Sequence, residues 1–417
     1  MLEFRGGCVE GEVSPPPSKS HTHRAFFMAA LAEGPSGVHG PLLSDDTRAT
    51  LRAVRSMGAS AEDVTGGVKI TGGSLHAPVG TIDVANSGTT MRIFSGIASI
   101  FDFPVTITGD ESIRKRPMGP LLDALSSMGV SCTSNNGLPP VTIKGPNRGG
   151  SVRIEGNISS QFVSSLMITA PMLERDTEIE IRNELVSAPY VRITESMMRH
   201  FGAEVTVSKN AIYVGAGGYR SKDYKVPADF SSAAFPLVAG ALGGKVTVSG
   251  LDMGDPQGDK HIMDILEEAG ADVSSGNGSV TVGTDRLEAA DIDMGPTPDL
   301  FPVVAVLLST AKGTSRLYGA PQLRFKESDR IVSTVKMLRA LGADAEETED
   351  GCIIRGKDAL EGGTVDHLDD HRIMMSAAVA SLVCKGPVYM SDTGCEAVSY
   401  PEFIDQMRTL GMNIRKY

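Results

Sequence analysis

Residues 51–60 read LRAVRSMGAS, an amphipathic helix that a glycine stops just before a strand begins. The same pattern occurs six times along the chain, and its glycines lie about 70 residues apart. They are Gly58, Gly129, Gly202, Gly270, Gly342 and Gly411. A constant period of this length predicts one supersecondary unit that is repeated six times.

A second type of segment keeps the same period and is typical of a buried helix. Residues 87–99, SGTTMRIFSGIAS, open with polar residues and are then apolar on nearly all sides. The equivalent segments are residues 18–34, 159–171, 230–244, 298–313 and 370–386. Short strand-like runs, bounded by Gly, Asn, Asp or Pro, separate the two types of helix. Each repeat is therefore predicted to be a βαβαββ unit with one buried and one half-exposed helix.

The length of the chain predicts two domains. Its 417 residues exceed what a single hydrophobic core organises, and six units divide naturally into two sets of three. A hydrophobic content of 41% and a charged content of 22% are typical of a globular enzyme. The fold class that we predict is α/β, with three repeats in each domain.

Composition argues against several classes of protein. No stretch approaches the roughly 20 uncharged apolar residues of a membrane span, and the first residues hold no apolar signal core. We therefore expect a cytoplasmic protein that does not enter membranes. Its five cysteines contain no CxxC pair, which indicates neither a disulfide framework nor a zinc site. The net charge of −12 argues against nucleic acid as a partner.

The polar residues that open the buried helices are the first candidate site. They hold equivalent positions in successive repeats: Lys19 and Ser20, residues 86–89, residues 159–161, Asp299 and residues 370–372. Helix N-termini carry free N–H groups and the positive end of the dipole, so parallel helices would bring several anion-binding ends together. Ordinary N-capping explains the Ser, Asn and Asp residues, and we favour it for residues 228–232. Capping does not require the cations Lys19, Arg24, Arg92 and Arg372.

Cations gather a second time in front of the half-exposed helices. The segments are IRKRP at residues 113–117, SAPYVR at 187–192 and LRFKESDR at 323–330. In an acidic chain this clustering predicts a local basic pocket for a small polyanion. Lys326 and Arg330 are four residues apart beside Glu327, whose acidity they would tune. A solvated loop explains Arg114 and Lys115 equally well.

These motifs carry a resemblance that covers the whole chain. The runs PPSKSHTHR, NSGTTMR, KRPM, SSQF, SAPY, PDLFP, LRFKESDR and DDHR, in this order, resemble the 5-enolpyruvylshikimate-3-phosphate (EPSP) synthase family of enolpyruvyl transferases. The resemblance implies two inverse α/β domains, each with three βαβαββ repeats around parallel buried helices. It implies domains at residues 14–222 and at 1–13 with 223–417, crossings near Val13 and Lys222, and an active site in the interdomain cleft.

The resemblance also implies two sets of ligand contacts. Those for shikimate 3-phosphate are Lys19, Ser20, Arg24, Ser159, Ser160, Gln161, Ser187, Asp299, Gln322 and Lys326. Those for phosphoenolpyruvate are Lys19, Asn86, Gly88, Arg116, Gln161, Arg330 and Arg372, with Thr89 shaping the same loop. Hydroxyl and amide groups suit the sugar-like ring, and guanidinium groups suit carboxylate and phosphate.

The implied reaction is an addition followed by an elimination, in the shikimate pathway to chorismate and the aromatic amino acids. Asp299 would accept the proton of the attacking hydroxyl, Glu327 would move protons at C3 of phosphoenolpyruvate, and Lys19 would help phosphate to leave. We expect no metal and no organic cofactor, a monomer, and sensitivity to the phosphonate glyphosate.

The chain departs from the family pattern at two positions. Val398 stands where many members have a lysine that binds phosphoenolpyruvate, and Lys416, Arg408 or no residue would replace it. Gln322 stands where some members have Asn, which keeps the amide but lengthens its reach.

Two other functions fit less well. The enolpyruvyl transferase that acts on UDP-N-acetylglucosamine expects Lys-Asn near the N-terminus and a reactive Cys in the RKRP loop, where this chain has Lys19-Ser20 and no cysteine. A non-catalytic ligand-binding repeat protein has no need of Asp299, Glu327 and several cations at matched positions. A phosphate-release assay separates both from the main hypothesis.

Overall fold

The structure, a computed structural model, describes residues 1–283 and 286–417. The chain divides into two compact units. The N-terminal unit is Pro17–Val226, and the C-terminal unit is Met1–Pro16 together with Pro227–Tyr417. The crossings thus lie at Pro16–Pro17 and at Val226–Pro227, and the sequence analysis placed them near Val13 and Lys222.

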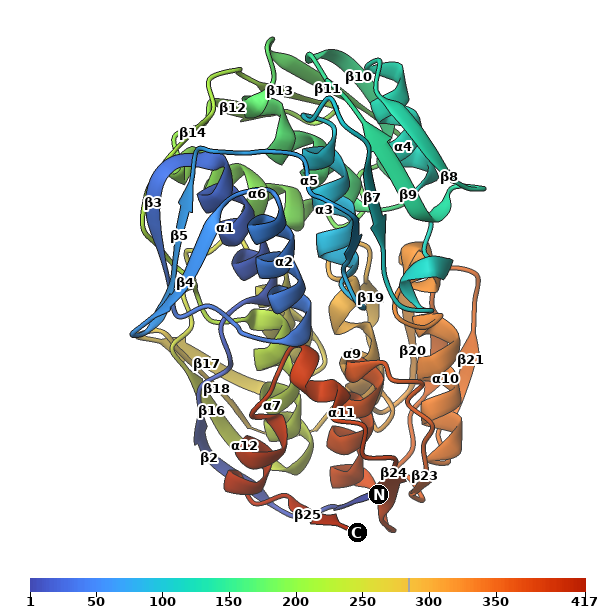
Figure 1. Ribbon diagram of the computed structural model, residues 1–417. Helices are drawn as coiled ribbons and strands as arrows, with labels where there is room; N and C mark the ends of the chain where they lie inside the picture. Colours follow the sequence, from blue (N-terminus) through green and yellow to red (C-terminus); the bar gives the residue numbers. More distant parts are fainter. Residues whose placement is uncertain (284–285) are drawn as a thin grey trace. The chain divides into compact units, whose positions relative to one another are not determined.

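The N-terminal unit contains three repeats, each with its own small sheet (Figure 1). The first has α1 (Lys19–Leu31), β3 (Ala32–His39), α2 (Asp45–Ser56), β4 (Ser60–Val64) and β5 (Gly67–Gly72), joined by β14 (Tyr219–Arg220) and β15 (Tyr224–Lys225). The second has β6 (Thr81–Asp83), α3 (Gly88–Ala98), β7 (Val105–Thr108), η1 (Ile113–Lys115), α4 (Gly119–Ser127), β8 (Ser131–Asn135) and β9 (Leu138–Lys144). The third has β10 (Gly150–Glu155), α5 (Ser160–Thr169), η2 (Ala170–Met172), β11 (Thr177–Arg182), α6 (Ala188–His200), β12 (Val205–Val207) and β13 (Ala211–Val214).

The C-terminal unit repeats this plan with help from the first residues of the chain. Its first repeat has β2 (Val9–Val13), α7 (Phe230–Gly243), β16 (Gly244–Ser249), η3 (Gly258–His261), α8 (Ile262–Glu268), β17 (Asp272–Gly276) and β18 (Ser279–Gly283). The next has β19 (Asp291–Asp293), η4 (Pro298–Leu300), α9 (Phe301–Leu308), β20 (Thr314–Tyr318), η5 (Pro321–Phe325), α10 (Arg330–Ala340), β21 (Asp344–Glu347) and β22 (Cys352–Arg355). The last has β23 (Gly363–Thr364), α11 (His371–Ala380), η6 (Ser381–Val383), β24 (Val388–Met390), η7 (Cys395–Val398), α12 (Phe403–Thr409), β25 (Asn413–Lys416) and β1 (Leu2–Arg5).

Each complete repeat is a βαβαββ unit, which confirms the fold class predicted from the period. In the second repeat, β6 pairs in parallel with β7, and β9 lies antiparallel between β7 and β8. The strand order of the other sheets follows the same scheme. The crossover between the two parallel strands is the buried helix, because parallel strands need a long connection.

The six periodic glycines end helices as predicted. Each of them has a positive φ, from 81° at Gly202 to 106° at Gly411. A residue without Cβ adopts this left-handed conformation at little cost, so it stops a helix and redirects the chain into the next strand.

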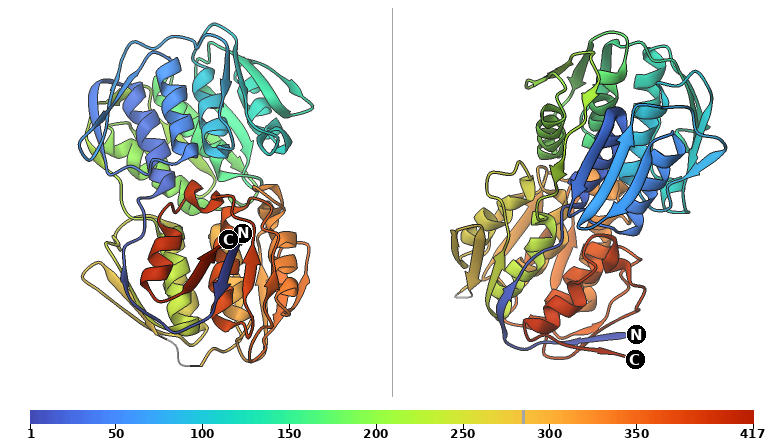
Figure 2. Two further views of the ribbon diagram at one scale, coloured as in Figure 1. Left: turned by 60° about the horizontal axis from the view of Figure 1, so that its bottom comes forward. Right: turned by 60° about the vertical axis from the view of Figure 1, so that its left-hand side comes forward.

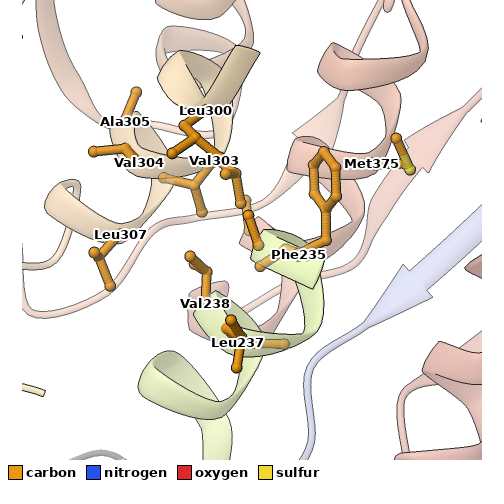
Figure 3. Close-up of a cluster of buried hydrophobic side chains, with 14 of the residues drawn as sticks. Phe235, Leu237, Val238, Leu300, Val303, Val304, Ala305, Leu307 and Met375 are labelled. Carbon is orange, nitrogen blue, oxygen red and sulfur yellow. The ribbon is translucent and has the colours of Figure 1, made fainter. Parts of the chain in front are cut away.

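The buried helices of each unit pack against one another. In the C-terminal unit, Phe235 and Val238 of α7 lie beside Val303 and Val304 of α9, with Met375 of α11 close to them (Figure 3). These side chains are at most 1% exposed. In the N-terminal unit α3 contacts α5 in the same way. A helix that is apolar on nearly all sides requires such apolar surroundings. The polar first turn of each buried helix is the part that these surroundings leave for other contacts.

The two chain ends meet in the C-terminal unit. β1 lies between β24 and β25, with Leu2 opposite both Met390 and Lys416. Both views of Figure 2 show the termini side by side, and the Met1 ammonium donates to the Tyr417 carbonyl at 3.0 Å. Among the described residues, no helix is long and apolar enough to cross a membrane.

Candidate active site

Lys19 is held at the start of α1 by a carboxylate on the next helix. Its Nζ lies 3.1 Å from Oδ2 of Asp46, in the first turn of α2. Both side chains are largely buried. The pair therefore fixes the ammonium group at the N-terminal ends of two adjacent helices.

Gly88 begins α3 beneath two guanidinium groups. A Cβ at this residue would lie 2.7 Å from Nη1 of Arg116 and 3.3 Å from Nη1 of Arg92. Arg116 Nη2 donates to Asn86 Oδ1 at 2.8 Å, two residues before the glycine. A helix N-terminus with two cations in direct reach is an anion-binding arrangement.

Gln161 links this arrangement to the third repeat. It lies in the first turn of α5, where its Nε2 donates to Thr89 Oγ1 at 3.1 Å and its Oε1 accepts from Arg92 Nη1 at 2.5 Å. The structure thus joins the openings of α3 and α5 through Asn86, Gly88, Arg116 and Gln161, while the contact shown for Lys19 is with Asp46.

The polar openings of α5 and α6 are shaped by their caps. Ser159 caps α5 by accepting from Gln161 N at 3.3 Å, and Ser160 is buried in the first turn. Ser187 caps α6 with φ of 54°, a left-handed conformation that is uncommon for a residue with a side chain. The surrounding structure therefore has to hold the Ser187 backbone in this conformation.

Arg24 is more enclosed than the sequence suggested. It is 1% exposed, its Nε donates to Thr194 Oγ1 at 2.8 Å, and its Nη1 donates to the carbonyl of Ser20 at 3.0 Å. Burial lowers its pKa to about 10. In this state Arg24 orders Ser20 and α6, and direct contact with a ligand stays a prediction.

Arg330 is the centre of a second cluster, in the C-terminal unit. It begins α10 and is 1% exposed. Its Nη1 donates to Asp299 Oδ1 at 2.9 Å, its Nη2 to Glu327 Oε2 at 2.5 Å, and its Nε to Asp370 Oδ2 at 3.0 Å. One guanidinium group therefore holds three carboxylates in place.

Asp299 receives two more cations in the same cluster. Arg372 Nη2 donates to its Oδ2 at 2.9 Å, and Lys326 Nζ lies 3.6 Å from its Oδ1. Asp370, which caps α11, also accepts from Ser328 Oγ at 2.9 Å. Because these residues open α9, α10 and α11, their contacts show that the starts of the three helices lie together.

The charges of the cluster shift its acidities in opposite directions. Burial would raise the pKa of Asp299, but Arg372, Lys326 and Arg330 outweigh it and hold that pKa well below its ordinary value. Burial would lower the pKa of Arg330, but Asp370, Glu327 and Asp299 raise it well above its ordinary value. At neutral pH Asp299 is therefore an ionised hydrogen-bond acceptor.

Asp259 is a site residue that the sequence analysis missed. It lies in η3, accepts a hydrogen bond from Ser231 and is 3% exposed. Burial and the nearby Asp299 raise its pKa to about 7, although Arg372 opposes them. Asp46 was missed as well. Asp46 lies in the first turn of α2 and Asp259 just before α8, and no local sequence pattern indicates which cation or carboxylate either of them meets.

The two departures from the family pattern have structural counterparts. Gln322 is 4% exposed and donates to the Gly295 carbonyl at 3.2 Å, while its buried Oε1 accepts no hydrogen bond from any described residue. Val398 ends η7. Lys416 binds Asp392 at 2.5 Å and Arg408 binds Asp405 at 3.4 Å, so each candidate replacement has an acidic partner in its own unit.

Each unit thus carries a preassembled set of charged groups at its helix openings. The N-terminal set is cationic around a glycine that leaves room for an anion. The C-terminal set pairs an ionised carboxylate with three cations. Such groups can bind phosphate and carboxylate, polarise them and accept a proton.

Known proteins resemble the chain over its whole length. A family model described as EPSP synthase (3-phosphoshikimate 1-carboxyvinyltransferase) matches residues 5–407. A 3-phosphoshikimate 1-carboxyvinyltransferase of Methanocorpusculum labreanum is 52% identical over 412 residues, which are 98% of each chain. One from Halobacterium salinarum is 42% identical over 424 residues, 97% of each chain.

A solved structure agrees with these relatives. EPSP synthase from Acinetobacter baumannii superimposes with a TM-score of 0.83 at 31% identity, covering 100% of this chain and 99% of that one. The matches in sequence and in structure leave one assignment: the chain belongs to the EPSP synthase family.

Proposed function

We propose that this protein transfers the enolpyruvyl group of phosphoenolpyruvate to the 5-hydroxyl of shikimate 3-phosphate, releasing phosphate. The observation that carries the proposal is the cluster of Asp299 with Arg330, Arg372 and Lys326, in a chain of this family. A carboxylate kept ionised beside guanidinium groups provides a proton acceptor next to binding groups for an anionic substrate. We propose that both clusters serve this one reaction.

Phosphoenolpyruvate would bind at the helix openings of α3, α10 and α11. Its phosphate and carboxylate match the guanidinium groups of Arg116, Arg330 and Arg372, which can bind them bidentately. The backbone at Gly88 offers N–H groups at the positive end of α3. Lys19, Asn86 and Gln161 complete the set that we assign to this substrate.

Shikimate 3-phosphate would occupy the hydroxyl-rich openings of α1, α5 and α6. Ser20, Ser159, Ser160, Gln161 and Ser187 offer donors and acceptors for the ring and its phosphate. Gln322 contributes an amide oxygen that no described residue engages. Lys19, Arg24, Asp299 and Lys326 are the charged members of this set.

The chemistry proceeds by addition and elimination. The 5-hydroxyl oxygen bonds to C2 of phosphoenolpyruvate as its proton passes to Asp299, while C3 gains a proton from Glu327. Glu327 then takes a proton back from C3, the C2=C3 double bond re-forms, and the bond between C2 and the phosphate oxygen breaks, so that phosphate leaves, stabilised by Lys19. When an anionic substrate binds Arg330 and Arg372, Asp299 shares these two cations with the substrate. The pKa of Asp299 then rises, and its carboxylate becomes a stronger base.

The test is a phosphate-release assay with shikimate 3-phosphate and phosphoenolpyruvate, with the enol ether product identified by mass spectrometry. A parallel reaction supplies UDP-N-acetylglucosamine as the acceptor. Asp344→Asn is a matched control for Asp299→Asn, because Asp344 is half exposed and pairs with Arg355 on the surface. Product with UDP-N-acetylglucosamine only, or phosphate release from neither acceptor, would overturn the proposal.

The physiological setting is proposed on the same basis. We place the enzyme in the cytoplasm as a monomer, in the shikimate pathway, without metal or organic cofactor. We also propose that glyphosate, an anion with a phosphonate and a carboxylate, competes for the groups assigned to phosphoenolpyruvate. Sedimentation with and without both ligands would test the monomer.

A further inference from the structure

Beneath the Lys19–Asp46 pair runs a continuous chain of buried hydrogen bonds. His23 Nδ1 lies 2.7 Å from Thr50 Oγ1, Thr50 Oγ1 lies 2.7 Å from Thr90 Oγ1, and Thr90 Oγ1 lies 2.7 Å from Ser87 Oγ. All four residues are fully buried. The reaction proposed above uses none of them.

This chain of hydrogen bonds connects the N-terminal parts of three helices, α1, α2 and α3. His23 follows Lys19 by one turn of α1, and Thr50 follows Asp46 by one turn of α2, so each lies directly below a member of the charged pair. Ser87 caps α3 by accepting from Thr90 N at 3.2 Å. The far end of the chain therefore reaches the residue next to Gly88.

The direction of the hydrogen bonds follows from an unsatisfied atom. His23 Nε2 is buried and has no hydrogen-bond partner among the residues that the structure describes. A hydrogen on Nε2 would be an unpaired buried donor, so the hydrogen lies on Nδ1 and is donated to Thr50. Thr50 then donates to Thr90, whose single hydroxyl hydrogen has two acceptors in reach, Ser87 Oγ at 2.7 Å and the Asp46 carbonyl at 3.4 Å.

A charged imidazole at His23 would disrupt this arrangement of hydrogen-bond donors and acceptors. Burial, reinforced by Lys19 and Arg24, holds the pKa of His23 well below its ordinary value. The imidazole ring of His23 therefore stays neutral.

We infer that His23, Thr50, Thr90 and Ser87 are positioning residues that keep the openings of α1, α2 and α3 in register, and so place Gly88 and its flanking residues for phosphoenolpyruvate. The inference rests on the proposed function. Its physical basis is that neutral hydrogen bonds between buried side chains of different helices favour one packing arrangement of those helices.

The central variant is Thr90→Val, which keeps the shape of the side chain and removes the hydroxyl that joins the chain. We expect KM for phosphoenolpyruvate to rise about tenfold, with KM for shikimate 3-phosphate changed less than about twofold. Thr90→Ser keeps the hydroxyl and should restore most of the loss. Likewise, His23→Asn keeps a donor near the Nδ1 position and should be closer to wild type than His23→Leu.

Thr169→Val is the matched control. Thr169 is also a buried helical threonine of this unit, but its hydroxyl donates to the Ser165 carbonyl of its own helix, at 2.8 Å. Its thermal unfolding should resemble that of Thr90→Val, and its KM values should be those of wild type. Equal rises of both KM values in Thr90→Val, or no rescue by Thr90→Ser, would overturn the inference.

Two readouts separate this inference from the proposed function. The ¹⁵N spectrum of histidine-labelled wild type should show His23, identified by its loss in His23→Asn, as the neutral Nδ1–H tautomer at neutral pH. Calorimetric titration with phosphoenolpyruvate alone should show about tenfold weaker binding to Thr90→Val. A wild type that releases no phosphate would refute the reaction. An Nε2–H tautomer of His23 would refute the hydrogen-bonded chain. Equal binding of phosphoenolpyruvate to wild type and to Thr90→Val would refute its effect on the substrate.

Discussion

Replacing Gly88 by alanine tests the N-terminal cluster directly. The new methyl would lie 2.7 Å from Arg116 Nη1, where ordinary contacts begin near about 3.4 Å. The guanidinium group must retreat by roughly 0.7 Å. Arg116 is 6% exposed and already donates to Asn86 at 2.8 Å, so this retreat strains or breaks that hydrogen bond.

The expected magnitude follows from the bond that is disturbed. A hydrogen bond to a charged group contributes about 1.5–3 kcal/mol, and losing half of it costs about 0.75–1.5 kcal/mol. This corresponds to a rise of about four- to twelvefold in KM for phosphoenolpyruvate, with little change for shikimate 3-phosphate. Glyphosate, which is longer, should lose more affinity than the substrate does.

The assay is steady-state phosphate release at several concentrations of phosphoenolpyruvate and glyphosate. Gly119→Ala is the matched control, because Gly119 also begins a helix of this unit but a Cβ there meets nothing within 4 Å. In an Arg116→Ala background, Gly88→Ala should cost almost nothing, since the displaced group is absent. Equal inhibition constants for wild type and Gly88→Ala, or additive losses in the double variant, would refute the reasoning.

Asp299→Asn should retain shikimate 3-phosphate binding within about tenfold while losing most turnover, because it removes the proton acceptor and keeps the side-chain shape; near-normal turnover would place the base elsewhere. Asp259 keeps its proton to about pH 7 when folded and releases it near its ordinary pKa when unfolded, so its contribution to stability falls as pH rises between about 4 and 7. The free energy of unfolding measured in urea should therefore rise for Asp259→Asn relative to wild type as pH increases across that range. A difference between the two proteins that does not depend on pH would contradict the raised pKa of Asp259. Glyphosate should inhibit wild type competitively with phosphoenolpyruvate. A noncompetitive pattern in initial rates would show that glyphosate does not bind at the phosphoenolpyruvate site. Shikimate 3-phosphate with glyphosate should lower the radius of gyration by bringing cations of both units onto shared anions; identical scattering curves would exclude such a closure.

Only packing decides which carboxylate each cation meets. The LRFKESDR run makes Arg330 a candidate beside Glu327, and that contact exists because the two are three residues apart. Its contacts with Asp299 and Asp370 come from segments about 30 and 40 residues away, and depend on how α9, α10 and α11 meet. The same holds for Asp46, whose place beside Lys19 no local pattern indicates.

The sequence by itself determined the repeated βαβαββ unit, because periodicity and helix-ending glycines act over a few residues, and all six predicted glycines have the left-handed conformation. It also determined the family, because charged motifs in a fixed order are preserved as short strings. Only the tertiary structure decided that Arg24 is enclosed, that Asp259 lies near enough to Asp299 for its charge to raise the pKa of Asp259, and that His23 reaches Ser87 through two threonines. Those facts depend on the rotation of each helix about its axis, which is set by apolar side chains filling the interior between helices, and a polar atom within that interior must take the partner that this packing brings to it.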